Sequence, residues 1–540
     1  HRDLHLSIRR QRQMCIRDSC YCHMAHISQY GYPIVTPMFY VVLEDGHIYI
    51  SSVNKYRKKI EHLINGKLNS NFVNNTSSVF NPATGEEASQ VVLGTEKCVQ
   101  DAVNSAKNAY ISWSSETPLM RSRKMFKLKE IIESRKNELA ELITLEHGKT
   151  FDDALGEVGR GLEVVEFACG IPNLLAGNYT SEVGRSIDSW SDNQPLGIVA
   201  GITPFNFPVM VPLWMFPIAI ACGNCFILKP SERDPSSTLL LAQMVLEAGF
   251  PPGVLNVVNG GKEAVDAILK NKDISAVSFV GSTPIAHYIY QEAAKYGKKV
   301  QAMGGAKNHM VVMPDADINL VCDSIMGSVF GSAGERCMAV SVVVPVGKET
   351  GDAIRTKITP MIENLKIGPG LEKTSEMGPL VTKQHLDKVK NYIDIGIKEG
   401  ADLVVDGRNF KLQGYENGYY VGGTFFDHVS TDMKIYQEEI FGPVMSMVRS
   451  ESMVEALEMV NNHDYGNGTA IFTSDGGVAR KFSNECQIGM VGINVPIPVP
   501  MAYHSFGGWK KSVFGGHAVY GLSLIHISEP TRLLSIWYAV

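Results

Sequence analysis

Short apolar runs alternate with helix-like segments between residues 197 and 294, and this alternation limits the possible folds more than any other feature. The runs are continuous rather than interrupted by polar residues, as expected of strands whose two faces are both covered. Strands that alternate with helices predict a parallel, doubly wound sheet of the α/β class. We therefore expect strands at 197–202, 225–228, 254–258 and 276–280, and helices at 208–221, 235–248, 263–269 and 283–294.

Periodic segments also precede and follow this region. Apolar residues recur at helical spacing over 118–147, with Thr117 positioned to cap one long helix and Gly148 positioned to end it. A further helix is expected at 152–169. The alternation resumes from about 308 to 491 and predicts a second α/β domain.

The composition narrows the class of protein. A length of 540 residues suits two or three domains, and 44% apolar with 20% charged residues is ordinary for a soluble globular enzyme. A formal net charge of −6 argues against nucleic acid as a main partner. The best apolar stretch, 208–222, contains several prolines and is shorter than the roughly 20 residues of a membrane span, so no membrane segment is expected.

Cysteine usage indicates a reducing compartment. The ten cysteines are few for this length and follow no framework spacing, so we expect reduced thiols in the cytoplasm, with the mitochondrial matrix as the alternative. Cys222 and Cys225 form a C-x-x-C pair that leads into a predicted strand without a thioredoxin-like unit around it. We interpret both as small core residues.

The two ends of the sequence differ in character from its middle. Residues 10–19 and 522–540 resemble translated adapter or vector sequence, so we interpret 1–62 as an uncertain or non-native extension and 522–540 as a non-native tail. Four residues beside the first stretch superficially resemble metal ligands: Cys20, Cys22, His23 and His26. No second ligand pair follows at zinc-site spacing, and no metal is expected.

The stretch 330–339 predicts a nucleophile. It places Cys337 behind two glycines and directly after Arg336. The thiolate is the reactive form of cysteine and is favoured by nearby positive charge, while glycines let the backbone approach a reacting carbon. The alternative is a buried structural cysteine, which is common among free cysteines.

A nicotinamide site has little support from motifs alone. The G-x-G-x-x-G fingerprint is absent, and the nearest glycines, Gly156, Gly159 and Gly161, lie inside a helical pattern in the wrong order. The evidence for a cofactor therefore has to come from elsewhere in the sequence.

Five sequence blocks together resemble the signature blocks of the aldehyde dehydrogenase superfamily, in that family's order and at its approximate spacing. The blocks are Thr-Pro-Phe-Asn-Phe-Pro at 203–208, Leu-Lys-Pro-Ser-Glu at 228–232, Phe-Val-Gly-Ser at 279–282, the Cys337 stretch, and Glu-Glu-Ile-Phe-Gly-Pro at 438–443. The resemblance covers about residues 63–521. It implies a Rossmann-type doubly wound cofactor domain, a second α/β catalytic domain and a small oligomerisation sheet.

The resemblance also implies domain boundaries and assembly. The expected parts are a cofactor domain at 63–176 and 196–306, an oligomerisation segment at 177–195, a catalytic domain at 307–495, and a return segment at 496–521. Family members form homo-oligomers, dimers or tetramers, through a final strand that pairs with a neighbouring subunit. Recognisable sequence stops near Gly521, before that strand, so we expect a weakened oligomer and an unpaired edge.

Site residues follow from the same resemblance. Cys337 would attack the aldehyde carbon, and the amide of Asn206 would stabilise the oxyanion with the backbone N–H of Cys337. From the residues alone, Asn206 is also a plausible turn asparagine. The expected NAD-binding residues are Thr203, Pro204, Phe205, Lys229, Glu232, Gly281, Ser282, Glu439 and Phe441. The Glu232 carboxylate would repel a 2′-phosphate, so NAD is expected rather than NADP.

Shorter blocks resemble the CoA-acylating semialdehyde dehydrogenases within this family. They lie at 156–161, 212–217, 305–309, 334–339 and 494–500. Hydrolytic members carry a water-activating glutamate in a Glu-Leu-Gly-Gly-Lys block, and Met303 falls at that place here. A thioether cannot take a proton, so a thiol such as CoA is expected to release the acyl group. Arg160 and Arg336 would hold a substrate carboxylate. The expected reaction is NAD-dependent conversion of methylmalonate or malonate semialdehyde to propionyl-CoA or acetyl-CoA, with loss of the carboxylate.

Two alternatives remain open at the level of sequence. One is a hydrolytic aldehyde dehydrogenase that uses another residue to activate water and gives a free acid. The other, from a different class, is a catalytically silent dinucleotide-binding or structural protein, against which Cys337 argues.

Overall fold

The computed structural model describes residues 21–27, 33–42, 48–52, 59–71, 75–521 and 531–537. The chain divides into two units, His1–Lys59 and Ile60–Val540, which are described separately. In the first unit, β1 (Tyr21–Ile27), β2 (Pro33–Val42) and β3 (Ile48–Ser52) form an antiparallel sheet in sequence order. The candidate metal ligands Cys20, Cys22, His23 and His26 lie outside the residues whose side chains are described. That they bind no metal stays a prediction.

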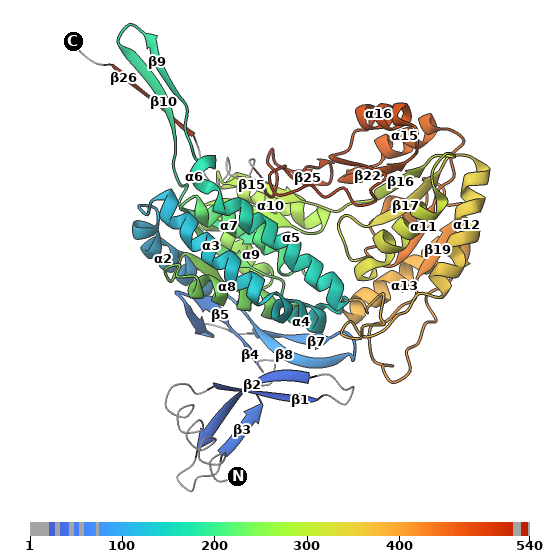
Figure 1. Ribbon diagram of the computed structural model, residues 1–540, viewed down its shortest axis with the longest axis horizontal. Coiled ribbons are helices and arrows are strands. Elements are labelled where there is room, and N and C mark those ends of the chain that lie inside the picture. The colour runs from blue at the N-terminus through green and yellow to red at the C-terminus, as the bar shows by residue number, and fades with distance from the viewer. Residues whose placement is uncertain are drawn as a thin grey trace, which may run out of the picture. The chain divides into compact units, whose positions relative to one another are not determined.

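An eight-stranded sheet lies at the centre of the first half of the second unit (Figure 1). Its parallel strands confirm the predicted strands, within two residues at each end: β11 (Ile198–Ile202), β12 (Cys225–Lys229), β13 (Leu255–Val257) and β14 (Ile274–Val280), with β15 (Lys299–Met303) beside β14. The sheet runs in the order β25-β15-β14-β11-β12-β13-β5-β6. Its antiparallel edges come from β5 (His62–Ile64), β6 (Lys67–Asn69) and β25 (Val513–Phe514).

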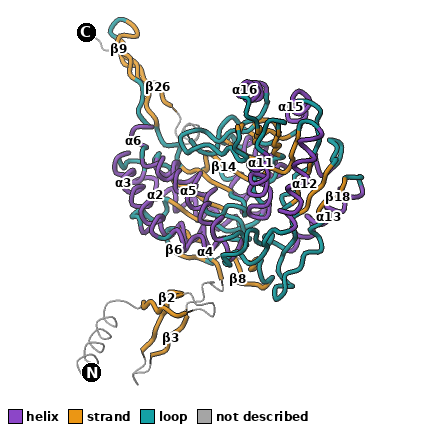
Figure 2. Tube along the Cα trace, turned by 45° about the vertical axis from the view of Figure 1, so that its right-hand side comes forward, coloured by secondary structure: helices purple, strands orange, loops and turns teal. Residues whose placement is uncertain are grey.

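Helices cover this sheet and confirm the predicted α/β alternation (Figure 2). They are α2 (Glu96–Trp113), α3 (Pro118–Ser134), α4 (Lys136–His147), α5 (Phe151–Cys169), α6 (Ile171–Leu174), α7 (Met210–Ala221), α8 (Ser236–Glu247), α9 (Lys262–Lys270) and α10 (Thr283–Lys295). Every residue of α7 is buried, and α7 packs against α5. Gly161 allows this close approach, because a Cβ there would lie 2.7 Å from Leu213 Cδ1.

The single helix predicted over 118–147 is wrong. It is two helices, α3 and α4, separated at Arg135, whose φ of −116° and ψ of 16° lie outside helical values. The Arg135 guanidinium is held by Glu138 and Glu247 at 2.8–3.0 Å. Because the apolar periodicity continues across the break, the pattern of apolar residues does not reveal it.

A second α/β sheet follows, as expected from residue 308 onward. Its order is β18-β19-β20-β17-β16-β22-β23. The strands are β16 (Asn308–Val312), β17 (Val340–Pro345), β18 (Asp402–Val405), β19 (Thr424–Asp427), β20 (Val444–Met447), β22 (Gly468–Phe472) and β23 (Met490–Ile493). The helices of this part are α11 (Ile318–Ile325), α12 (Lys348–Glu363), α13 (Lys383–Lys398), α14 (Lys434–Gln437), α15 (Met453–Asn462) and α16 (Gly476–Glu485).

Small sheets complete the described fold. The segment expected to mediate oligomerisation forms a hairpin of β9 (Tyr179–Gly184) and β10 (Ile187–Asn193) (Figure 1). β26 (Thr531–Trp537) pairs antiparallel with β10, so the prediction of an unpaired edge is wrong for β10. β4 (Lys59–Ile60), β7 (Asn75–Asn81) and β8 (Glu86–Leu93) form another sheet, and β21 (Tyr465–Gly466) pairs with β24 (Trp509–Lys510). The predicted domain boundaries and the non-native origin of both ends stay predictions.

Burial of the two C-x-x-C cysteines confirms their interpretation as core residues: Cys222 and Cys225 are both 0% exposed. Among the described helices, none has the length and apolar character needed to cross a membrane.

A buried arginine caps α7, the helix that leads away from the site. Arg121 is 4% exposed, and its guanidinium donates hydrogen bonds to the carbonyls of Ala221 (2.7 Å), Cys222 (3.3 Å) and Glu116. Removing it leaves buried helix-end carbonyls without these donors.

We predict that Arg121→Met lowers the free energy of unfolding by about 2–4 kcal/mol, because several charge-assisted bonds are lost together. Urea unfolding followed by fluorescence measures the change. Arg123→Met is the matched control, because Arg123 lies on α3 like Arg121 but is exposed. Its free energy of unfolding should stay within about 0.5 kcal/mol of the wild-type value. Equal stabilities of the two variants would contradict the capping role.

Candidate active site

Two cavities meet at Cys337. The first, which we call the α5 cavity, has a volume of about 460 Å³ and is lined by residues of α5, α7 and the segment 497–519. The second, the sheet-edge cavity, has a volume of about 900 Å³ and lies at the carboxyl ends of β11, β12 and β14. Val280, Gly304 and Cys337 line both. The thiol is therefore accessible from two sides.

The predicted site residues come together around these cavities. Asn206 lines the sheet-edge cavity. So does every predicted cofactor residue: Thr203, Pro204, Phe205, Lys229, Glu232, Gly281, Ser282, Glu439 and Phe441. Arg160, Arg336 and Met303 line the α5 cavity. Residues that are far apart in the sequence thus surround one sulfur.

A strained turn carries the nucleophile. After α11 the chain passes through a π-turn, Met326–Phe330, into Gly331–Gly334. Ser332 (φ 49°) and Ala333 (φ 51°) are left-handed, which costs roughly 1–2 kcal/mol for each such residue. Gly334 continues the turn at φ 73°, and a Cβ there would lie 2.3 Å from the Gly442 carbonyl oxygen. The surrounding structure must therefore hold this turn in place.

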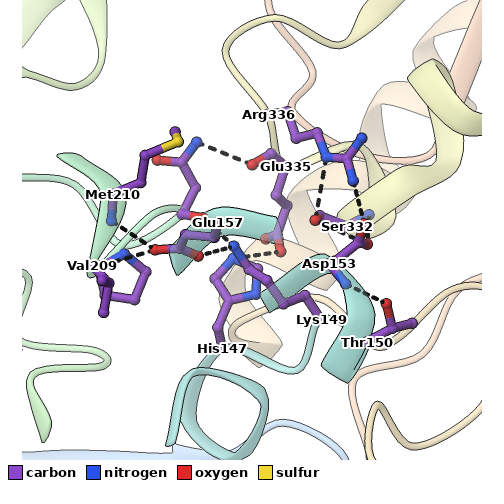
Figure 3. Close-up of polar contacts among 12 residues, drawn as sticks. His147, Lys149, Thr150, Asp153, Glu157, Val209, Met210, Ser332, Glu335 and Arg336 are labelled. Carbon is purple, nitrogen blue, oxygen red and sulfur yellow. Dashed lines mark hydrogen bonds and ion pairs between the residues drawn. The ribbon is translucent and has the colours of Figure 1, made fainter. Parts of the chain in front are cut away.

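Asp153 of α5 provides much of that support. One carboxylate oxygen accepts hydrogen bonds from the backbone N–H of Ser332 (2.9 Å) and from its hydroxyl (3.2 Å). The other oxygen accepts from Arg336 Nη2 at 2.6 Å (Figure 3). The remaining Arg336 bonds go to the Ser332 hydroxyl and the Gly327 carbonyl. Arg336 thus ties the turn to α5.

Side-chain amides hold Cys337 itself. Its carbonyl oxygen accepts hydrogen bonds from Asn308 Nδ2 (2.9 Å) and Asn467 Nδ2 (3.2 Å). On the other side, Asn206 Nδ2 lies 3.5 Å from the Cys337 sulfur and 3.1 Å from the carbonyl oxygen of Glu335. The Asn206 amide therefore points at the position where an oxyanion would form beside the sulfur.

Burial, and after it the carboxylate of Glu439, raise the pKa of the Cys337 thiol to about 11. The Asn206 hydrogen bond and the charge of Lys149 act in the opposite direction. The expectation that Arg336 favours the thiolate is not met, because its guanidinium is directed to Asp153. Reaction at neutral pH therefore requires removal of the thiol proton.

Asp152, Asp153 and Glu157 line the α5 cavity, but among the described residues no carboxylate is hydrogen-bonded to the sulfur. Met303 ends β15, lines this cavity, and is 4% exposed. The sulfur is instead hydrogen-bonded by the amide of Asn206. The nearest acid on the sheet-edge side, Glu439, accepts a hydrogen bond from the backbone N–H of Ala306 at 2.9 Å. Burial raises its pKa.

The sheet-edge cavity has the features of a dinucleotide site. Lys229 Nζ lies 3.3 Å from Glu232 Oε2 at the end of β12. α10 begins there with Ser282 as N-cap, and this positive end of the helix dipole lies at the cavity, where it favours an anion. The Thr203 hydroxyl is buried without a hydrogen-bond partner. These groups fit a ribose, a pyrophosphate and further polar atoms of a bound dinucleotide.

Sequence reasoning missed three charged residues of this cavity, Arg233, Lys262 and Lys388, and the neutral His385. The Arg233 guanidinium lies 4.8 Å from the centre of the Phe205 ring. His385 Nε2 lies 2.6 Å from the Phe441 carbonyl oxygen. Arg233 directly follows the block at 228–232, which is the one signal that pointed to it.

Glu335, two residues before the nucleophile, was also missed. Its carboxyl group lies between His147 Nε2 (3.6 Å) and His385 Nε2 (3.5 Å) and accepts from the Val381 N–H (3.3 Å). Burial raises the pKa of Glu335 to about 8. Burial also lowers the pKa of His147 well below its usual value and that of His385 to about 4. All three groups are therefore neutral near pH 7.

We predict that Glu335 lowers the free energy of unfolding by roughly 1 kcal/mol per pH unit as pH rises from 6.5 to 8.5. The folded state keeps a proton up to about pH 8 that the unfolded state releases near pH 4.5, so raising the pH across this window favours unfolding. Glu335→Gln cannot ionise and should reduce this slope. Part of the slope should remain in this variant, because burial also raises the pKa of Glu146 to about 7.

Urea unfolding at several pH values measures the slope. Glu451→Gln, at an exposed carboxylate, is the control and should retain the wild-type slope. A Glu335→Gln variant whose stability varies with pH as the wild type does would show that Glu335 is ionised in the folded protein at neutral pH.

Comparison with known proteins agrees with this geometry. The family model described as "Aldehyde dehydrogenase family" matches residues 70–529. The chain belongs to the aldehyde dehydrogenase family. As a member of that family it is an oxidoreductase, and its two-sheet fold is the one expected from the sequence blocks.

Similar proteins within the family have related names. The chain is 55% identical over 462 residues to the malonate-semialdehyde dehydrogenase of Pseudomonas aeruginosa, covering 86% of this chain and 93% of that protein. It is 47% identical over 460 residues to malonate-semialdehyde dehydrogenase 2 of Geobacillus kaustophilus, covering 85% and 95%.

Solved structures give the same picture. One is a crystal structure of a protein from Sinorhizobium meliloti that is described as a methylmalonate-semialdehyde dehydrogenase and is complexed with NAD. It matches with a TM-score of 0.89 and 53% identity, covering 89% of this chain and 98% of that one. The methylmalonate-semialdehyde dehydrogenase of Oceanimonas doudoroffii matches with a TM-score of 0.88 and 54% identity, covering 90% and 99%.

Proposed function

We propose that this enzyme oxidises methylmalonate or malonate semialdehyde with NAD and transfers the resulting acyl group to CoA. The observation that carries the proposal is the surroundings of Cys337. Met303 and Cys337 both line the α5 cavity, and no carboxylate is hydrogen-bonded to that sulfur among the described residues. The names of the similar proteins support the class of substrate.

The first step is attack of the Cys337 thiolate on the aldehyde carbon. A carbon–sulfur bond forms, and the carbonyl oxygen becomes an alkoxide. Asn206 Nδ2, 3.5 Å from the sulfur, and the backbone N–H of Cys337 would donate hydrogen bonds to this oxygen. Loss of one such donor typically costs about 10²–10³ in rate.

The residues of the sheet-edge cavity fit NAD. When bound, NAD accepts the hydride that leaves the substrate carbon as the thioester forms. Glu232 would accept hydrogen bonds from a ribose, the N-terminus of α10 would bind the pyrophosphate, and Glu439 would hold the second ribose. Nearby Lys229 lowers the pKa of Glu232. An ionised carboxylate repels a 2′-phosphate, which favours NAD over NADP.

The substrate carboxylate would bind in the α5 cavity. Arg160 Nη2 donates to the Pro500 carbonyl oxygen at 2.9 Å, and Nη1 to Glu163 at 2.6 Å, at the cavity wall. A carboxylate that replaces the Pro500 carbonyl would gain a charge-assisted bond. Arg336 keeps N–H groups beyond those bound to Asp153, Ser332 and Gly327. It would complete the carboxylate site.

Decarboxylation and transfer complete the reaction. The bond to the β-carboxylate breaks and its electron pair moves into the thioester carbonyl, giving CO2 and an enolate stabilised by the oxyanion donors. Protonation of the enolate carbon gives the propionyl or acetyl thioester. The CoA thiol then attacks and loses its proton, and Cys337 leaves as thiolate. Water would attack slowly, because a missing general base costs roughly 10²–10⁴-fold.

We predict that steady-state NADH production depends on CoA. Enzyme, NAD and semialdehyde without CoA should give one rapid turnover of NADH per active Cys337 and then a rate reduced roughly 10²-fold or more. Absorbance at the NADH band and mass spectrometry of the products measure both. Cys337→Ala should abolish the initial turnover. Equal steady-state rates with and without CoA, with free acid as product, would rule out the acylating reaction.

We predict that Arg160→Met lowers kcat/KM for the semialdehyde roughly 30-fold or more, because a half-buried charge partner of the carboxylate is lost. Propanal carries no carboxylate, so kcat/KM for propanal should change less than about threefold. Arg480→Met, an exposed arginine remote from the cavities, is the matched control. An equal loss on both aldehydes would show that Arg160 supports the cavity rather than the carboxylate.

Hydrolysis to a free acid is the second candidate, and Glu439 favours it. This carboxylate lies close enough to raise the pKa of Cys337 and lines the sheet-edge cavity. In that case Glu439 would activate water, and Glu439→Gln would lose acid production without CoA. Under the acylating proposal there is little acid production to lose.

Assembly and location belong to the same proposal. We propose a homo-oligomer that uses the β9–β10 hairpin, where Tyr179 is 65% and Val183 is 53% exposed. The bacterial sources of the similar proteins favour the cytoplasm as its compartment.

A further inference from the structure

We propose that Lys149 and Glu157 are positioning residues that hold the oxyanion donor Asn206 against Cys337. The inference rests on the role proposed above for Asn206. Lys149 Nζ lies 2.8 Å from Glu157 Oε2, and both side chains are 0% exposed (Figure 3). Neither residue hydrogen-bonds the sulfur, and the bonds of the pair end on the loop that carries Asn206. The charge of Lys149 also lowers the pKa of Cys337, so the test has to separate this direct effect from the effect that passes through Asn206.

Lys149 binds the residue that carries the donor. Its Nζ donates a hydrogen bond to the backbone carbonyl of Asn206 at 2.6 Å. It also lies 4.3 Å from the centre of the Phe207 ring, so the ammonium faces a second residue of the same loop. The cation therefore fixes the peptide from which the Asn206 amide projects.

Glu157 binds the other end of that loop. Its Oε1 accepts hydrogen bonds from the backbone N–H groups of Val209 (2.8 Å) and Met210 (3.1 Å), at the start of α7. A carboxylate at a helix N-terminus satisfies donors that the helix itself leaves unpaired. The pair thus holds the loop at Asn206 through one member and at Val209 and Met210 through the other.

The local structure places Lys149 and Glu157 beside the loop that runs from Asn206 to Met210. α4 ends at Gly148, which is left-handed at φ 98°, and Thr150 caps α5 by accepting from the Asp153 N–H. Lys149 lies between the two helices and points to α5 (Figure 3). Glu157 lies on the first turns of α5, on the side that packs against α7.

The energetics favour a positioning role over a stabilising one. A buried ion pair often adds little stability compared with apolar residues of similar volume, because both ions lose their hydration. Its hydrogen bonds are directional, however, and four of them end on the pair and the loop. A misplacement of about 1 Å near a reacting centre can cost roughly 10²-fold in rate.

The test is a double-mutant cycle on the rate of the first NADH turnover. We expect Lys149→Met/Glu157→Leu to slow this turnover roughly 10–100-fold, with the affinity for NAD unchanged and Tm lowered by less than about 4 °C. Lys127→Met/Glu130→Leu removes an exposed ion pair of α3 and is the matched control. It should leave the turnover rate unchanged.

Asn206→Ala completes the cycle. If the pair acts through Asn206, adding Lys149→Met/Glu157→Leu to Asn206→Ala slows the turnover by less than about threefold further. Multiplication of the two separate effects would overturn the proposal, since a merely structural role predicts that outcome. An Asn206→Ala variant with the wild-type rate would instead refute the oxyanion role, and with it the proposed mechanism at that step.

A single variant provides the test if the double variant does not fold. Glu157→Gln keeps an oxygen for the Val209 and Met210 N–H groups but loses the charge that faces Lys149. We expect an intermediate loss of rate, roughly 3–30-fold, which again disappears in the Asn206→Ala background. A loss that persists there would overturn the proposal.

Discussion

One face of α5 connects the two halves of the site. Asp153, Glu157 and Arg160 are spaced four and three residues apart, so their side chains share one side of the helix. Asp153 binds the turn that carries Cys337, Glu157 binds the loop that carries Asn206, and Arg160 binds the carbonyl of Pro500. Because these contacts reach separate parts of the chain, the relative positions of sulfur and amide depend on a single rigid helix.

Burial sets the charge state of the groups around this helix. It raises the pKa of Glu335 and Cys337 and lowers that of His147 and His385, so each of these groups favours its neutral form. The Lys149–Glu157 pair differs, because each ion has the other as a partner at 2.8 Å. The ammonium of Lys149 is therefore close enough to lower the pKa of Cys337, although it is itself fully buried.

The parts predictable from sequence were those with a local signal. Continuous apolar runs identified β11, β12, β13 and β14, and the sequence blocks identified the residues that surround Cys337. The break at Arg135 was not predictable, because apolar residues keep their helical spacing across it and the partner Glu247 lies far away in the sequence. The left-handed turn at Ser332 likewise depends on Asp153. Contacts of this kind leave no periodic pattern.

The two cavities that meet at Cys337 have largely separate walls. Val280 and Gly304 are the other residues common to both cavities, so nearly all wall residues belong to one cavity alone. Trp214 lines the α5 cavity alone and Glu232 lines the sheet-edge cavity alone, so a substitution at either residue alters the wall of one cavity directly. Selection or engineering could thus broaden the range of acyl groups while leaving the choice of oxidant untouched.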